Sequence, residues 1–310
     1  MDTLRSIESF VKAVESGSIA AGARQLGITP AAASQNIQRL EKSLDARLLH
    51  RSTRSLALTD AGLLYFNAVK SIVRNLELAK SSVTEYQGEP QGRLRVACSA
   101  AFGRHVIAAL IPAFTRRYPR VSFELITTDE SIDHIKEDID ISIRFRQQLE
   151  LNMIARRIAS IPLHFCASPD YLARAGRPDS PEALGQFDCL MFRMPSVGRV
   201  LNWPLVKDGL RFEPEITPVI TSNDIDVLAR LAAGGAGITR LSDFIAQPYL
   251  QSGQLESLFP TDSEAQGVAQ SEPLEFYVTY HDRQAMTHKV RAFVDYLVDA
   301  MPAAWKHKPL

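Results

Sequence analysis

A row of polar and basic side chains near residue 30 has the chemistry to bind DNA. Serine and glutamine side chains both donate and accept hydrogen bonds, so they can pair with base edges in the major groove. Arginine side chains neutralise phosphates and position a protein on the duplex. We therefore predict that this row contacts double-stranded DNA. Its members are Thr29, Pro30, Ala31, Ser34, Gln35, Gln38 and Arg39.

The spacing of apolar residues predicts the helix that carries this row. Thr29 can cap a helix, and Pro30 suits its first position. Two shorter helical patterns precede it over residues 4–14 and 19–26, with a glycine turn at Gly27. Two short helices joined by such a turn have the layout of a helix-turn-helix, although a plain three-helix bundle shows the same periodicity. The apolar stripe of the third helix consists of Ala33, Ile37, Leu40 and Leu44.

Residues 47–58 form two short extended pieces around a basic tip, a pattern typical of a wing. Arg51 and Arg54 lie at this tip and could reach phosphates or the minor groove, although an ordinary exposed loop would look similar. The stretch from Arg24 to Arg54 holds six basic and two acidic residues. A local basic patch attracts polyanions even in a neutral molecule, which agrees with DNA as the partner.

A long amphipathic helix is predicted after Thr59, reaching about Tyr86. At 1.5 Å per residue it would be ~42 Å long, too long for a small DNA-binding module to bury alone. The simplest partner for its single apolar stripe is a second copy of the chain, giving a two-fold homodimer, and the alternative is the rest of the same chain. A two-fold dimer predicts half-sites ~34 Å apart. The stripe consists of Ala61, Leu64, Ala68, Ile72, Leu76, Ala79, Val83 and Tyr86.

Strands and helices alternate from Gly92 onwards, which predicts an α/β domain with a mostly parallel sheet covered on both faces. Ligands of such sheets lie at the carboxyl ends of the strands, where helices begin. Polar residues at these ends could bind a small organic anion, although the same residues also serve as caps. The candidate effector-binding residues are Ser99, Ala100, Thr128, Arg144, Ser222 and Asn223.

The stretch from Phe10 to Gly62 resembles the winged helix-turn-helix of LysR-type transcriptional regulators. The resemblance rests on the alanine-rich helix, the Thr-Pro cap, Leu40-Glu41, the Arg-Leu-Leu-x-Arg wing and the Leu-Thr-x-Ala-Gly motif. "FCASPDYLARAG" and "SNDIDVLARLAAGGAGITRLSDF", which begin at Phe165 and Ser222, are similar to the effector domain of that family. The resemblance implies a periplasmic-binding-protein-like domain, whose cleft lies between two α/β subdomains.

This resemblance divides the chain into four segments. We expect a winged helix-turn-helix over residues 1–58, a linker and dimerisation helix over 59–88, effector subdomain I over 89–161 plus 268–304, and subdomain II over 162–267. It implies a repressor or activator that is modulated by a small molecule and that assembles as a homodimer or homotetramer.

Composition limits the remaining alternatives. The chain has 310 residues, 35 basic and 35 acidic, with a hydrophobic share of 45%. These values are typical of a folded protein of more than one domain, and we expect it in the cytoplasm, with no membrane partner, cofactor or metal. An enzyme with a helical cap is disfavoured, because we find no nucleophile elbow, P-loop or metal motif. A redox-sensing regulator that uses Cys98, Cys166 or Cys189 is a further alternative.

Overall fold

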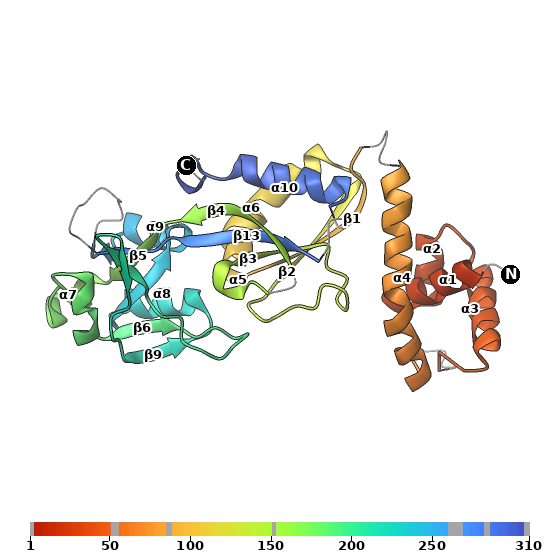
Figure 1. Ribbon diagram of the computed structural model, residues 1–310, viewed down its shortest axis with the longest axis horizontal. Helices are drawn as coiled ribbons and strands as arrows, with labels where there is room; N and C mark the ends of the chain where they lie inside the picture. Colours follow the sequence, from red (N-terminus) through yellow and green to blue (C-terminus); the bar gives the residue numbers. More distant parts are fainter. Residues whose placement is uncertain are drawn as a thin grey trace. The chain divides into compact units, whose positions relative to one another are not determined.

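The computed structural model describes residues 3–50, 56–84, 89–150, 153–259, 269–281 and 286–306. The chain folds into two compact units, residues 1–88 and 89–310 (Figure 1). Each unit has its own hydrophobic core.

The first unit begins with three helices, which confirms the predicted order. They are α1 (Thr3–Glu15), α2 (Ile19–Gln25) and α3 (Pro30–Leu44). The hydroxyl of Thr29 accepts a hydrogen bond from the amide of Ala32 at 3.2 Å, so this residue caps α3 as expected. The prediction for Leu44 was wrong. This side chain is 39% exposed, because α3 ends here and Asp45 turns into the left-handed region with φ 48°.

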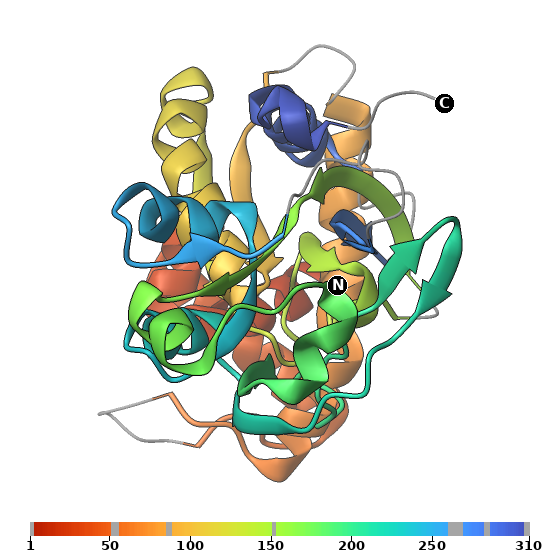
Figure 2. The same ribbon diagram turned by 90° about the vertical axis from the view of Figure 1, so that its left-hand side faces the viewer.

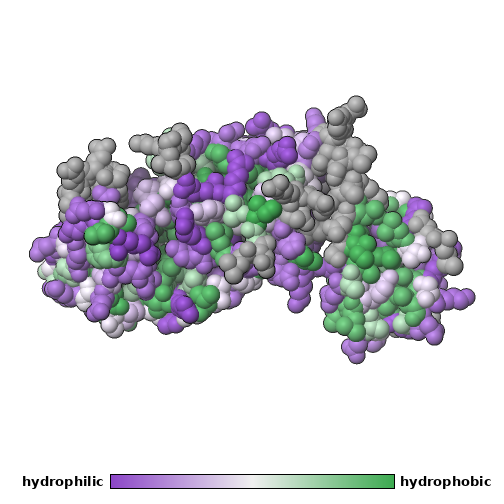
Figure 3. Space-filling model, in the orientation of Figure 1, coloured by the Kyte–Doolittle hydropathy of each residue, from purple (hydrophilic) through white to green (hydrophobic). Residues whose placement is uncertain are grey.

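Helix α4 (Asp60–Thr84) follows and has two apolar faces. One face packs on the three helices: Val69 and Val73 are buried there, and the rings of Tyr65 and Phe66 lie 6.0 and 6.3 Å from that of Phe10. Another face carries Ala61, Leu64, Ala68 and Ile72, four members of the predicted stripe, and all four are exposed. Figure 3 shows apolar side chains gathered over this helix. Tyr86 lies outside the described residues.

The second unit contains two five-stranded sheets. Sheet I has the order β2-β1-β3-β13-β4, and sheet II has the order β11-β5-β10-β6-β9. The strands of sheet I are β1 (Gly92–Cys98), β2 (Val121–Thr127), β3 (Ile141–Phe145), β4 (Ile154–Ile161) and β13 (Leu274–Tyr280). Those of sheet II are β5 (Leu163–Ala167), β6 (Cys189–Phe192), β9 (Pro218–Ser222), β10 (Ile238–Ser242) and β11 (Glu256–Ser257). A small third sheet joins β7 (Leu205–Lys207), β8 (Leu210–Phe212) and β12 (Gln270–Ser271).

The expected mostly parallel sheet was wrong. Each large sheet combines two parallel and two antiparallel pairings. In sheet I the antiparallel strand is β13, which pairs with β3 and β4 after the chain has passed through sheet II. In sheet II, β5 follows directly from sheet I after Pro162 and runs antiparallel to β10. The chain therefore crosses between the sheets twice, and the strand that follows each crossing runs antiparallel to its neighbours.

Helices cover these sheets. The helical stretch from α5 (Ala100–Phe102) through a π-helical turn (Gly103–Ile107) to α6 (Ala108–Arg117) lies beside α10 (His288–Ala300) against sheet I (Figure 1). Helices α8 (Ile225–Ala233) and α9 (Asp243–Gln251) pack on sheet II. Helix α7 (Pro169–Ala175) lies at the end of the unit that faces the viewer in Figure 2.

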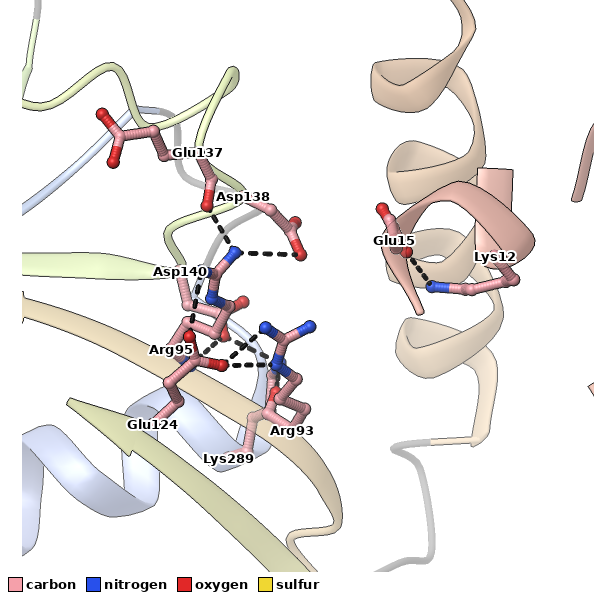
Figure 4. A network of polar contacts seen from close by, with 9 residues as sticks. All are labelled: Lys12, Glu15, Arg93, Arg95, Glu124, Glu137, Asp138, Asp140 and Lys289. Atoms are coloured by element: carbon pink, nitrogen blue, oxygen red, sulfur yellow. Dashed lines mark hydrogen bonds and ion pairs between the residues drawn. The ribbon is translucent and has the colours of Figure 1, made fainter. Parts of the chain in front are cut away.

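A polar network fastens the end of sheet I at which the chain enters the second unit (Figure 4). Arg93 and Arg95 both donate to the carboxylate of Glu124, at 2.9 and 3.0 Å. The carboxylate of Asp140 accepts from the amide of Arg95 at 2.9 Å and from Lys289 Nζ at 3.0 Å. These contacts hold β1, β2, α10 and the loop before β3 together.

Candidate DNA-binding face and effector cavity

The outer side of α3 carries the polar row that the sequence predicts. Ala33, Ile37 and Leu40 turn the inner side of this helix to the core, with at most 3% exposure. A helix that buries one stripe presents the opposite stripe to solvent. The structure exposes all seven members of the row except Ser34, which is half-buried. It therefore brings the candidate DNA contacts together on one surface of one helix and its cap.

A buried hydrogen-bond chain fixes the orientation of α3 on α1. Asn36 Nδ2 donates to Ser9 Oγ at 2.9 Å, and this hydroxyl donates to the carbonyl of Arg5 at 2.8 Å. Ser9 is only 1% exposed. Sequence reasoning missed this contact, which joins residues 27 positions apart.

The chain folds back on itself after α3, as a wing does. Leu49 and Leu58 form an antiparallel bridge, and the amide of His50 donates to the carbonyl of Ala57 at 2.9 Å. The carboxylate of Glu41 accepts from the amide of Leu48 at 2.8 Å, which ties the base of the wing to α3. The predicted phosphate contacts Arg51 and Arg54 lie outside the described residues.

A cavity of about 80 Å³ lies between the two large sheets of the second unit. Aromatic rings make much of its wall: Phe102, Phe145, Phe192, Trp203, Phe244 and Phe276. Its polar lining consists of Ser99, Asp129, Thr239, Arg240 and Ser242. An apolar cavity with a few converging polar groups is the usual form of a small-molecule site.

The structure separates the predicted effector-binding residues. Ser99 lines this cavity. The amide of Ala100 donates to Asp129 Oδ1 at 3.3 Å, and Thr128 Oγ1 accepts from the amide of Glu130 at 3.1 Å. Both residues thus act as local caps next to the cavity.

The remaining predicted residues lie elsewhere. Arg144 borders a separate polar cavity of about 20 Å³ and donates through Nη1 to the carbonyl of Thr128. Burial lowers the pKa of this guanidinium. Ser222 Oγ accepts from the amide of Asp224 at 3.1 Å, and Asn223 is exposed. Neither Ser222 nor Asn223 lines either cavity.

The cavity between the two large sheets, here named the main cavity, is lined by two charged residues that the sequence did not predict, Asp129 and Arg240. Burial raises the pKa of the Asp129 carboxyl, although hydrogen bonds from Gln148 and the Ala100 amide oppose this shift. Burial lowers the pKa of the Arg240 guanidinium to about 9, which leaves it charged at neutral pH. Arg240 also lies 5.9 Å from the centre of the Trp203 ring. An arginine within the buried strand β10 was the available signal.

A polar contact joins the two halves of the second unit beside this cavity. Asp226, in the first turn of α8, is ion-paired with Arg104 and lies 2.7 Å from His105 Nε2. Arg104 and His105 belong to the π-helical turn that follows α5. The ring of His105 lies 6.0 Å from that of Phe244, which lines the cavity. A side chain that lines the cavity therefore lies next to this contact.

The three cysteines are buried. Burial raises the pKa of the Cys98 thiol and raises the pKa of Cys166 and of Cys189 to about 12. The thiolate is the nucleophile in oxidation, so a raised pKa and lack of access both disfavour it. These environments do not favour the redox-sensing alternative.

Native protein at pH 8 is therefore expected to react negligibly with Ellman's reagent. A thiol with a pKa near 12 is ionised to about one part in ten thousand at pH 8, and its thiolate forms only as the pH approaches 12. Urea-unfolded protein should titrate three thiols. One thiol that reacts within seconds in the native protein would contradict this reading.

No three His, Cys, Asp or Glu side chains in the described part of the chain are grouped to hold a metal ion. No helix in the same ranges is both long and apolar enough to cross a membrane.

Comparison with known proteins assigns both units. Residues 4–63 match the family model of the bacterial regulatory helix-turn-helix protein, lysR family, and residues 87–302 match the LysR substrate binding domain. The chain is 32% identical to the HTH-type transcriptional regulator CrgA of Neisseria meningitidis over 292 residues, which cover 94% of this chain and 95% of that one. It is 29% identical to the HTH-type transcriptional activator TtdR of Escherichia coli, with 97% and 93% covered.

Solved structures agree with this result. The crystal structure of CrgA from Neisseria meningitidis aligns at a TM-score of 0.56 and 31% identity, over 95% of this chain and 97% of that one. The full-length virulence activator AphB of Vibrio cholerae aligns at a TM-score of 0.58 and 26% identity, over 96% and 98%. The chain belongs to the LysR family and is a DNA-binding transcriptional regulator, not an enzyme.

Proposed function

We propose that the protein reads its operator with the exposed row on α3, as a two-fold dimer, and that a small organic acid in the main cavity modulates this binding. The observation that carries the proposal is the division of α3 into a buried apolar side and an exposed polar and basic side. This helix is fixed to α1 by the Asn36–Ser9 hydrogen bond, so it can present the row as a rigid unit.

Within the row we propose a division of labour. Ser34, Gln35 and Gln38 contact base edges, and Arg39 contacts phosphate, as do Arg51 and Arg54 of the wing. Thr29, Pro30 and Ala31 bring the start of the helix against the groove. Helices of this type place their N-terminal residues on the bases and leave basic side chains for the backbone.

Gln35→Ala is expected to reduce discrimination between matched and mismatched base pairs by about 1–3 kcal/mol, because a bidentate amide contact is lost. Arg39→Ala should weaken matched and mismatched duplexes alike, because phosphates are the same in every sequence. Both variants can be titrated against duplexes from a footprinted site upstream of the protein's own gene. An equal loss on all duplexes from Gln35→Ala would refute its role in base reading.

We propose that the exposed apolar face of α4 is the dimer interface, and that two dimers associate into a homotetramer. Leu64 is 74% and Ile72 is 53% exposed on this face, while the adjacent face of the helix, with Val69 and Val73, is already covered by the unit's own core. Contiguous exposed apolar side chains of this kind mark protein interfaces. We propose that the chain has four functional segments: the winged helix-turn-helix over residues 1–58, the linker and dimerisation helix over 59–88, effector subdomain I over 89–161 plus 268–304, and subdomain II over 162–267.

The chemistry and the volume of the main cavity, about 80 Å³, support a small carboxylic acid with an apolar body as the effector. Its aromatic wall suits an apolar body, and Ser99 and Arg240 supply a hydroxyl and a cation for the acid group. Ala100 and Thr128 stabilise the turns around Ser99 and Asp129. Arg144 donates a hydrogen bond to the carbonyl of Thr128. Ser222 ends β9, and Asn223 precedes Asp224, the cap of α8, whose Ile225 lines the cavity. A movement of the two halves on ligand binding would act on the Arg104–Asp226 contact, which joins them.

Ser99→Ala is expected to weaken binding of propionate, a small apolar carboxylate, by about fivefold, which is the usual net contribution of one hydrogen bond, about 1 kcal/mol. Isothermal titration of the full-length protein measures this change. Ser222→Ala is the matched control, because its hydroxyl caps Asp224 outside the cavity, and it should bind as the wild type does. Equal affinity of the Ser99 variant and the wild type would remove Ser99 from the site.

A further inference from the structure

A polar groove of about 420 Å³ runs between the first turn of α1 and the side of α3. It borders the row of candidate DNA contacts without coinciding with it. Only Gln35 and Arg39 belong to both. The groove is lined by Thr3, Arg5, Ser6, Ile28, Ala32, Gln35, Asn36, Arg39, Leu40 and Ser43.

The lining of this groove has the composition of an anion site. Arg5 and Arg39 supply two guanidinium groups, one from each wall, and both side chains are exposed. Hydroxyl and amide groups supply further hydrogen-bond donors, and no carboxylate is among the lining residues. Guanidinium groups bind phosphate oxygens through charge-assisted and often bidentate hydrogen bonds. The groove therefore matches a phosphate in both charge and donor chemistry.

The two walls are held at a fixed separation. Asn36 of α3 donates to Ser9 of α1, and Ser9 donates to the carbonyl of Arg5 itself. Ser6 and Ser9 are buried beneath the groove at 7% and 1% exposure. The backbone that carries Arg5 is thus connected directly to the helix that carries Gln35, so any ligand of Arg5 has a defined position relative to bases contacted by Gln35.

We propose that this groove binds a backbone phosphate of the DNA strand that flanks the bases contacted by α3, with Arg5 and Arg39 as its two ligands. The inference rests on the proposed DNA reading by α3 and adds α1 to the interface. Because Gln35 and Arg39 line both surfaces, a strand in contact with the polar row continues into the groove. Phosphate contacts of this kind set the register of a protein on the duplex and contribute salt-dependent affinity without sequence preference.

The test measures the salt dependence of binding for full-length Arg5→Gln on a mixed-sequence 40-base-pair duplex, by fluorescence anisotropy across a series of NaCl concentrations. Each lost phosphate contact lowers the slope of log K against log [NaCl] by about 0.9, so a dimer that loses two contacts should lower it by about 1.8. The ratio of affinities for two different duplexes should stay at the wild-type value, whereas Gln35→Ala should change that ratio.

Lys12→Gln is the matched control. It removes the same charge from the same helix, seven residues further along, where Lys12 pairs with Glu15 at 3.2 Å (Figure 4). This variant should retain the wild-type slope. A wild-type slope in Arg5→Gln, or an equal fall in Lys12→Gln, would overturn the groove proposal while leaving DNA reading by α3 intact. Absence of any salt-dependent binding by the wild type would instead overturn both.

Discussion

Replacing Leu64 and Ile72 together by glutamate is expected to separate the dimer into monomers at its α4 interface. It is also expected to weaken operator binding by about a hundredfold or more. Both side chains lie on the exposed apolar face of α4, away from the core of their own unit. In a two-fold interface each residue occurs twice, so the double substitution removes four apolar side chains. Full burial of one such side chain contributes roughly 1.5–3 kcal/mol, so the loss is of the order of 6 kcal/mol or more before the cost of the new charges.

The effect on DNA binding follows because the dimer joins two α3 helices, each of which binds one half-site. A dimer that has bound one half-site presents its second α3 at a high effective concentration, and this advantage amounts to a factor of about 10² to 10⁴. Sedimentation velocity measures the assembly state, and a titration of the operator measures the affinity. Retained mass and affinity in the double variant would place the dimer interface elsewhere.

Asn67→Glu is the matched control for this experiment. Asn67 is exposed on the same helix but does not belong to the apolar face, so it adds one negative charge without removing apolar surface. The control should remain associated as the wild type does. Dissociation of the control as well would show that added charge on α4, not loss of apolar contact, separates the subunits.

Gly62→Ala is expected to destabilise the first unit by about 2–4 kcal/mol and to abolish DNA binding. A Cβ atom at Gly62 would lie 2.0 Å from the carbonyl oxygen of Leu48, and this oxygen already accepts a hydrogen bond from the amide of Thr59 at 3.0 Å. Leu48 is 1% exposed, so neither the carbonyl nor its side chain can move away without disturbing the core. Overpacking against a fixed backbone is among the more costly kinds of substitution.

Two spectroscopic signals separate this effect from a change in the second unit. Both tryptophans, Trp203 and Trp305, belong to the second unit. Circular dichroism follows the helices of both units, whereas tryptophan fluorescence follows the second unit. On urea unfolding, Gly62→Ala should lower the midpoint of a circular dichroism transition and leave the fluorescence midpoint unchanged.

Gly234→Ala provides the same substitution at a permissive position. Gly234 has φ −78°, and a Cβ there would lie no closer than 3.4 Å to another atom. Its unfolding midpoints should be close to those of the wild type. An unchanged circular dichroism midpoint in Gly62→Ala would show that α4 can shift away from Leu48.

The helices of the first unit could be predicted because their signals are local. The cap Thr29, the proline at the start of α3 and the 3.6-residue periodicity all act within a few residues. The error at Leu44 arose where periodicity alone cannot show that a helix has ended. The Ser9–Asn36 contact joins residues 27 positions apart, and no local pattern reports it.

The second unit was less predictable because its pairings are distant in sequence. Strand β13 pairs with β3, about 130 residues earlier, and this antiparallel pairing contradicts the parallel sheet that strand–helix alternation favours. Strand ends identified Ser99 at the main cavity but also selected Ser222 and Asn223, which lie outside it. The alternation does not report which strand ends face the same cavity.

The sequence by itself determined the order of helices in the first unit, the exposed chemistry of α3 and the membership of the LysR family, because periodicity, caps and motifs are written in neighbouring residues. Only the tertiary structure decided the mixed pairing of the two sheets, the place of Asp129 and Arg240 in the cavity wall, and the groove that Arg5 shares with Arg39. These features depend on contacts between distant segments, whose geometry is fixed only when the whole core has packed.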